Sequence, residues 1–226
     1  MKTIKIRLYE FAELEEKAKD KALKELFDIN VNFDWYDTVF YDFQAIVKTL
    51  GISLTANNIH FSGFYSQGDG SAFKASVNLP ELLAGVKNEN WKSYAPLLEL
   101  DLPVYEADKH LIKLIKNEGI DISPQIIQPT RSYYVRVDMN FQFPYNNHRF
   151  DRIEAELEKL EEWLQAVADK LNRYLYKSLQ DDYDYQTSDK AIIEAIEANE
   201  YHFTADGKLA TRIERLSLEN NTITAS

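Results

Sequence analysis

The chain has 226 residues, no cysteine, and 37 acidic against 26 basic residues, for a net charge of −11. The lack of cysteine excludes disulfides, thiol nucleophiles and cysteine-ligated metals. The net charge disfavours a large DNA-binding face, because phosphate contacts need clustered lysine and arginine. The 45% of apolar and 13% of aromatic residues are typical of a folded domain. With neither a signal peptide nor an apolar run long enough to span a bilayer, we expect a cytoplasmic protein without membrane contacts.

The first fifty residues predict one strand and two helices. Residues 3–8 alternate between apolar and polar side chains, which predicts an opening strand. Apolar residues then return at helical spacing, so a helix is expected from about Glu10. A second helix is expected from an N-cap at Asp34 to Leu50, with Gly51 at the C′ position.

The middle of the chain predicts a hairpin, short helical pieces and a long strand. Two strands, 58–66 and 71–78, flank a Gln-Gly-Asp-Gly turn. Prolines break residues 80–118 into short helices, and Pro124 and Pro129 bracket a loop. Strict alternation over 133–143 predicts a half-buried strand with Tyr133 among its core positions.

The last third predicts a long helix over residues 151–178, in which apolar residues recur every three or four positions. A loop over 180–185, a helix over 188–199 and an Asp-Gly turn at 206–207 follow, and residues 213–226 are expected to fray. The sum is an α+β fold: one antiparallel sheet of five to six strands with helices on one face, including the long C-terminal helix. No linker divides the chain, so a single domain over residues 1–226 is expected.

The negative charge is concentrated late in the chain. Residues 151–206 hold 15 acids and 6 bases. In the predicted loop the acids are interleaved with tyrosines, which are candidates for binding a protein partner: Asp181, Asp182, Tyr183, Asp184 and Tyr185. The pattern is typical of a solvated surface. The alternative is an acidic surface that docks on a basic partner, with carboxylates in place of phosphates and tyrosines as apolar anchors.

The hairpin is the other candidate site. Tyr65, Gln67 and Asp69 would be presented by a binding loop, although a tight turn that needs its glycines explains the block as well. An enzyme site using His60, Ser66 or Asp69 is a further alternative. The glycines lie between strands, whereas a phosphate-binding loop needs a helix N-terminus behind it. No catalytic residue, metal ligand or cofactor is predicted from the spacing of the histidines and acids.

Three blocks resemble small uncharacterised proteins of bacteriophages and prophages. Residues 62–73, Ser-Gly-Phe-Tyr-Ser-Gln-Gly-Asp-Gly-Ser-Ala-Phe, resemble their Ser-Gly-Phe-x-Ser-Gln-Gly-Asp-Gly-x-x-Phe block. Residues 8–37 are similar to their N-terminal helices, and residues 183–207 to their C-terminal block. The resemblance implies an origin in a mobile element and supplies no catalytic residues. Anti-CRISPR proteins are among the small acidic phage proteins that block host defences, so the resemblance extends to them by analogy.

These observations predict an inhibitor of a bacterial defence system. It would bind stoichiometrically to a basic nucleic-acid-binding effector, such as a CRISPR nuclease complex in the host cytoplasm, without binding DNA itself. One alternative is a phage accessory or scaffolding protein of replication or regulation. The other is an enzyme with an unrecognised site on the 60–73 hairpin. The sequence leaves the oligomeric state open.

Overall fold

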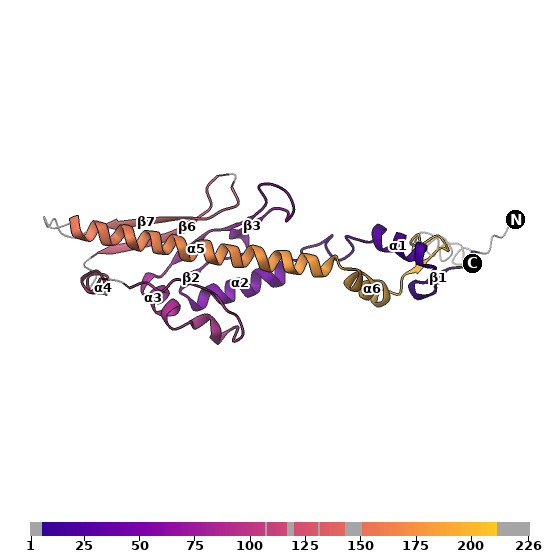
Figure 1. Cartoon of the computed structure of the whole chain (residues 1–226), viewed down its shortest axis with the longest axis horizontal. Coiled ribbons are helices and arrows are strands. Elements are labelled where there is room, and N and C mark those ends of the chain that lie inside the picture. The colour runs from indigo at the N-terminus through magenta and orange to yellow at the C-terminus, as the bar shows by residue number, and fades with distance from the viewer. Residues whose placement is uncertain (1–5, 107, 117–119, 131, 143–150, 212–226) are drawn as a thin grey trace, which may run out of the picture. The chain divides into compact units, whose positions relative to one another are not determined.

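The computed structural model describes residues 6–106, 108–116, 120–130, 132–142 and 151–211 (Figure 1). The chain divides into two compact units, residues 36–180 and residues 1–35 with 181–226. The α+β class is confirmed, with antiparallel strands and a long C-terminal helix, α5 (Asp151–Gln186). A single domain over residues 1–226 stays a prediction.

The unit of residues 36–180 combines a four-stranded sheet, a strand pair, four α-helices and two short 3-10 helices (Ala56–Asn58 and Asn90–Ser93) among its described residues. The sheet has the order β2-β5-β6-β7 and is antiparallel throughout, and β3 pairs separately with β4. The largest sheet therefore has four strands, fewer than the five to six expected. The elements are α2 (Asp37–Thr49), β2 (Ile52–Ser53), β3 (Ile59–Phe61), β4 (Ser71–Phe73), β5 (Ala75–Val77), α3 (Leu79–Lys87), α4 (Lys109–Lys116), β6 (Asp121–Ile127), β7 (Arg136–Gln142) and α5 up to residue 180.

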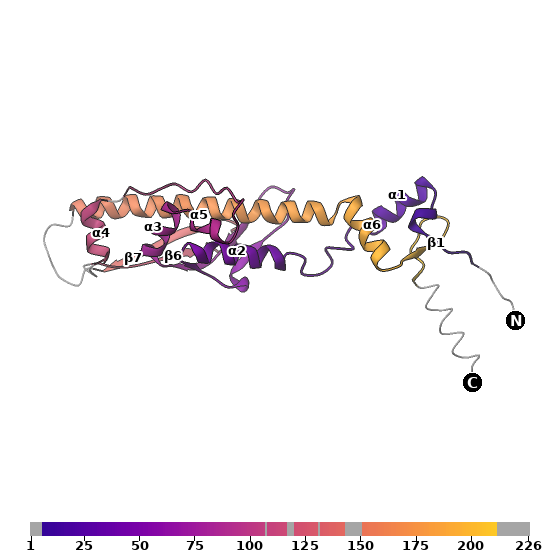
Figure 2. The same cartoon turned by 90° about the horizontal axis from the view of Figure 1, so that it is seen from below.

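Helix α5 carries the apolar stripe that the sequence predicts, and it runs alongside β6 and β7 (Figures 1 and 2). The buried positions recur every three or four residues, as expected for one face of a helix. They are Leu157, Leu160, Leu164, Val167, Leu171, Leu175 and Leu179. Aromatic side chains of α2 and β4 pack in the same unit, with Phe43 and Phe73 in an edge-to-face contact of 5.2 Å between ring centroids. The prediction of a long C-terminal helix is confirmed.

The sheet strands differ from the prediction at their ends. In the expected strand 133–143, Val137 and Met139 are buried as predicted. Tyr133 is not a core residue, because it precedes β7 and is 41% exposed. Pro124 does not begin a loop but lies inside β6, opposite Met139. It lies just past the part of β6 that pairs with β5, so its missing N–H is tolerated there.

The predicted hairpin is shorter than expected. β3 and β4 pair in the register Ile59 with Phe73 and Phe61 with Ser71, which leaves residues 62–70 as a nine-residue loop instead of a four-residue turn. At the start of α2 the N-cap position is Tyr36 and not Asp34, and the Tyr36 ring packs on Phe40 with 4.9 Å between the ring centroids. Gly51 follows α2 with φ of 73°, as expected of a glycine at C′.

The second unit is built from β1 (Tyr9–Glu10), a short 3-10 helix (Phe11–Glu13), α1 (Glu16–Glu25), α6 (Asp189–Ala198) and β8 (His202–Phe203). β1 pairs antiparallel with β8. Residues 6–8 are not in a strand, so the opening strand begins later than predicted; residues 3–5 and the tail 213–226 lie outside the described residues. Helix α6 is confirmed, with the Ser188 hydroxyl accepting the Ala191 N–H as N-cap.

The core of this second unit is small and joins both ends of the chain. Its buried side chains come from the 3-10 helix, α1, α6 and β8: Phe11, Leu14, Ala18, Ala22, Ile192, Ile196 and Phe203. The Asp-Gly turn after β8 packs directly on α1. Lys21 donates to the carboxylate of Asp206 at 2.9 Å, and Gly207 has φ of 80°.

Gly207→Ala should destabilise the protein strongly. A β-carbon at Gly207 would lie 2.2 Å from the carbonyl oxygen of Ala18, and the positive φ adds strain, so we expect a loss of about 3 kcal/mol. Gly68→Ala is the matched control, since Gly68 also has a positive φ but no atom within 4 Å; it should cost only about 1 kcal/mol. Urea unfolding followed by circular dichroism measures both. If both variants lose the same free energy of unfolding, the contact between Gly207 and α1 is not tight.

Candidate protein-binding surfaces

The Tyr–Asp segment is helical, which corrects the prediction of a loop over residues 180–185. Helix α5 continues to Gln186, so Asp181 to Tyr185 form its last turn and a half. Three acids in four residues lower the helix propensity of this stretch. Aromatic packing within the unit favours the helix nonetheless, since the Tyr183 ring lies 5.7 Å from that of Trp35.

Helical geometry separates the five predicted residues into two groups. Asp181, Asp184 and Tyr185 are exposed, as residues spaced by three and four positions share a face. Asp182 and Tyr183 are half-buried on the other side. Of the five residues, only the first group is exposed to solvent, and partner binding by these residues stays a prediction.

The exposed acids continue into α6. We call residues 181–200 the acidic segment: they hold seven carboxylates and one base, Lys190. Six of the carboxylates are exposed: Asp181, Asp184, Asp189, Glu194, Glu197 and Glu200. Lys190 lies 3.9 Å from Glu194 in a well-exposed ion pair, which contributes little stability. The Tyr185 hydroxyl lies 3.4 Å from the carboxylate of Glu194, so the end of α5 and α6 contribute to the same surface.

A groove of about 420 Å³ extends this surface. Glu197 and Glu200 line it together with Glu10 from β1 and His202 from β8. Three carboxylates around a concave site add to the negative potential of the acidic segment, because a cleft concentrates the field of the charges that line it.

Two aspartates in this unit titrate away from their usual range. Partial burial raises the pKa of Asp182, and a hydrogen bond with Gln186 opposes the rise. Side-chain hydrogen bonds from Thr204 and Lys21 lower the pKa of Asp206 to about 2. Asp182 is therefore the least suitable carboxylate of the segment for binding a cation, and Asp206 serves to hold the turn on α1.

In the hairpin loop, Asp69 has a structural role. The carboxylate of Asp69 accepts the backbone N–H of Ser66 at 2.7 Å, and the Ser62 hydroxyl accepts that of Gly70 at 3.1 Å. These bonds close the loop on itself. The Ser66–Asp69 contact uses the backbone of Ser66, which is the bonding of a turn and not that of a nucleophile with its base.

The rest of the loop is fastened to α5. The Ser71 hydroxyl donates to the side-chain oxygen of Asn172 at 2.9 Å, and the Asn172 amide donates back to the Ser71 carbonyl at 2.7 Å. The Tyr176 hydroxyl donates to the carbonyl of Gly63 at 3.2 Å. The Ser-Gly-Phe and Gly-Ser parts of the block thus have a structural explanation.

Tyr65 and Gln67 are the predicted loop residues that remain exposed. Tyr65 is 71% exposed, and Gln67 is exposed beside it at the loop tip. The three loop candidates therefore divide into two surface residues and one turn residue, Asp69. They belong to a different compact unit from the acidic segment.

The sequence did not reveal a second acidic groove, of about 640 Å³, between β7 and α5. Its lining residues are Arg136, Val137, Asp138, Glu158, Glu161, Glu162 and Gln165. The spacing of Glu158, Glu161 and Gln165 places them on one side of a helix, which was the available signal. Nothing in the sequence, however, showed that β7 lies beside that face.

Within the described residues, no helix is long and apolar enough to cross a membrane. The histidines, aspartates and glutamates of the described ranges form no group of three that would hold a metal ion.

Asn172→Ala should destabilise the protein by about 1–3 kcal/mol, because it removes the side-chain amide that donates to the carbonyl of Ser71, a residue that is 1% exposed. The Ser71 hydroxyl can still donate to the backbone carbonyl of residue 172. Gln67→Ala, in the exposed part of the same block, should change stability by less than about 0.5 kcal/mol. Urea unfolding compares the two variants. If Asn172→Ala is neutral, the hairpin block is not held by α5.

Asp182→Asn and Asp206→Asn should have opposite effects on the melting temperature. The raised pKa of Asp182 makes its carboxylate destabilising at neutral pH, so the amide raises the melting temperature there. This gain should vanish as the pH falls below the unfolded value of about 4. The lowered pKa of Asp206 stabilises the fold above that value, so the amide lowers the melting temperature at neutral pH, and the deficit shrinks between about pH 4 and 2. Calorimetry from pH 7 downward measures the melting temperatures of both variants. If these temperatures differ from the parent in the same direction at every pH, the two aspartates do not have opposite pKa shifts.

No curated protein and no solved structure was found that matches the chain. Residues 35–189 match the model of a protein family that is described as a domain of unknown function, DUF8835. This match covers β2 to β7, α2 and all of α5, and thus the hairpin block and the first residues of the acidic segment. Because it spans more than half of the sequence, the protein belongs to the DUF8835 family.

Proposed function

We propose that the protein is an inhibitor of a bacterial defence system, which acts by binding a basic, nucleic-acid-binding surface of an effector complex such as a CRISPR nuclease. The observation that carries the proposal is the acidic segment. Six exposed carboxylates against one lysine follow one another over the last turns of α5 and over α6. A surface with this charge occupies a nucleic-acid channel by placing carboxylates where phosphates would lie.

The rigidity of the segment supports this proposal. Carboxylates on helices are held at fixed spacing, whereas those on a loop would lose conformational entropy on binding. Ser188 caps α6, and Asn30 fixes the junction of the helices by donating to the carbonyls of Gln186 and Ala191. The preorganised charges therefore bind at a lower entropic cost.

Tyr185 adds an apolar contact to the exposed carboxylates of the acidic segment. Tyr185 is 50% exposed between carboxylates. Exposed aromatic rings inside a charged surface are frequent energetic centres of protein interfaces, because they bury a large apolar area with few rotamers to fix. The resemblance of residues 62–73 to phage and prophage proteins supports a role against a host system in particular.

The test is a phage infection assay in bacterial strains that each carry one active nuclease defence system. Expression of the protein should restore plaque formation in at least one strain. The double variant Asp181→Lys with Asp184→Lys should lose this effect, and its affinity for the purified effector of that strain should fall at least about tenfold. Asp182 is left unchanged, because it is half-buried.

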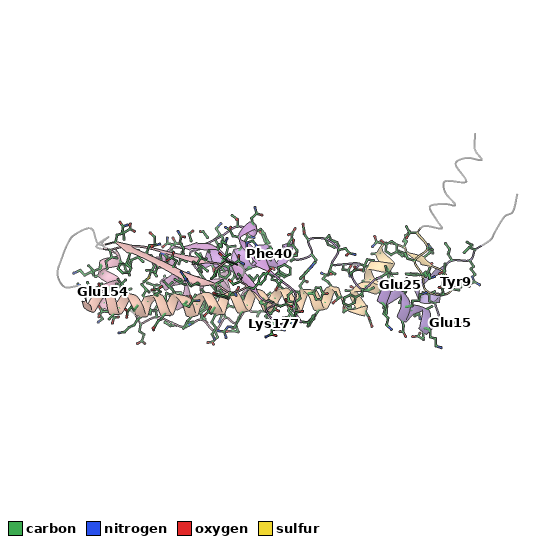
Figure 3. The ribbon with its side chains drawn as sticks, turned by 90° about the horizontal axis from the view of Figure 1, so that it is seen from above. Tyr9, Glu15, Glu25, Phe40, Glu154 and Lys177 are labelled. Atoms are coloured by element: carbon green, nitrogen blue, oxygen red, sulfur yellow. The ribbon has the colours of Figure 1, made fainter. Side chains whose placement is uncertain are left out.

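The matched control carries the same charge change on α1 and the residues after it, Glu25→Lys with Asp28→Lys; Figure 3 shows Glu25 on α1. Both of these residues are exposed and lie outside the acidic segment. The control should keep full activity, and both variants should keep the melting temperature of the parent. Absence of restored plaques in every strain would overturn the inhibitor function. Restoration that both double variants preserve would overturn the acidic segment as its binding surface.

A further inference from the structure

A third groove, of about 410 Å³, lies between α2 and β2 in the unit of residues 36–180. One wall is a side of α2, because residues spaced by three and four positions share a face of a helix. This wall consists of Tyr41, Gln44, Ala45 and Lys48, and the opposite wall of β2 with Leu54 after it. Apolar side chains and a few polar ones therefore meet in one concave site, which is the usual composition of a binding pocket.

The charge of this groove differs from that of the whole chain. Carboxylates line the grooves beside α6 and β7, whereas Lys48 is the one charged residue among those that line this groove. Lys48 is exposed, and within the described part of the chain it takes part in no ion pair. The chain has a net charge of −11, so a groove with a lysine and no carboxylate is a local site for an anionic group.

Large apolar side chains are exposed around α2. Tyr41, on the wall of the groove, is well exposed. The Tyr94 hydroxyl donates to the carboxylate of Asp42 at 2.7 Å, which holds the exposed Tyr94 ring at the helix next to Tyr41. Leu97, three residues after Tyr94 in the same loop, is 95% exposed. Exposed apolar side chains that gather in one region are typical of a protein interaction site.

An ordered loop presents Leu97 to solvent. The indole N–H of Trp91, a buried residue, donates to the carbonyl of Leu98 at 3.0 Å. The N–H of Ala95 bonds to the carbonyl of Trp91 at 2.9 Å. The backbone is therefore fixed on both sides of Leu97, and a partner that covers this side chain loses little free energy in ordering the loop.

We propose that the groove between α2 and β2, together with Tyr94 and Leu97, binds a segment of a partner protein in which an apolar side chain is flanked by aspartate or glutamate. The apolar side chain packs in the groove on Tyr41 and Ala45, and a flanking carboxylate pairs with Lys48. Burial of an apolar anchor in a pocket supplies most of the affinity in such an interface. The charge pair supplies specificity, because a basic segment would meet a like charge.

Charge and shape select this occupant over others. A single lysine does not supply the clustered bases that the phosphates of a nucleic acid require. Two copies of a chain with a net charge of −11 repel each other. A small organic anion would pair with Lys48 but leave Leu97 uncovered, whereas a protein segment covers both. The acidic segment belongs to the other compact unit, so this inference does not depend on the proposed function.

Selection from a displayed library of random peptides, with the full chain as the target, tests the inference. The enriched peptides should share an apolar residue next to aspartate or glutamate. In fluorescence anisotropy, the most enriched peptide should bind saturably, and a copy with lysine in place of each acid should bind at least about tenfold more weakly. Absence of enriched peptides, or enriched peptides without acids, would overturn the proposal.

Variants locate the peptide on the protein. Lys48→Glu reverses the charge of the groove and Tyr41→Ser removes its exposed ring, so each should weaken binding at least about tenfold. Both side chains are exposed, so the melting temperature should be kept. Lys87→Glu is the matched control, because Lys87 is also an exposed lysine in the last turn of a helix, α3, and this variant should bind as the parent does.

Binding that both groove variants preserve would overturn the proposal. A dimer in sedimentation that Tyr41→Ser dissociates would assign the groove to a second copy of the chain, and would overturn it as well.

Discussion

The apolar stripe of α5 is the constraint on which the larger unit depends. The leucines from Leu157 to Leu179, together with Val167, lie at helical spacing, and all of these stripe positions are almost fully buried. Burying one such side chain contributes about 1.5–3 kcal/mol, so the stripe supplies a large part of the hydrophobic stabilisation. The strands that surround it are only two to seven residues long and would be marginal alone.

The polar flank of the same helix determines where the surrounding elements attach. Gln165, Asn172 and Tyr176 are spaced by seven and four residues, which places them on one side of α5. Each bonds to the backbone of another element: Gln165 to β7, Asn172 to Ser71 of β4, and Tyr176 to the loop at Gly63. Side-chain amides and hydroxyls thus satisfy backbone groups that have no strand partner there, which is what buried or edge polar groups require.

Helices and strands with long periodic patterns could be predicted from the sequence, whereas the ends of short strands could not. The stripe of α5, helix α6, and the buried face of β7 at Val137 and Met139 all follow from spacing. The predicted boundaries of the hairpin strands were wrong, because three-residue strands end where their tertiary partners end. The predicted loop from Pro124 was also wrong. In the candidate site, Asp181 and Asp184 were predicted as surface acids, but their segment is helical and not a loop, and the Trp35 ring that packs against Tyr183 comes from a distant part of the sequence.

Helical geometry determines which acids of the acidic segment form one surface. Asp181, Asp184 and Tyr185 share a face at the end of α5, and the Ser188 cap begins α6, which carries the exposed acids that follow. Asp182 is half-buried and lies outside this face, although it stands between two of these residues in the sequence. Because the remaining carboxylates are exposed, any attraction between them and a cationic group weakens as salt screens the charges.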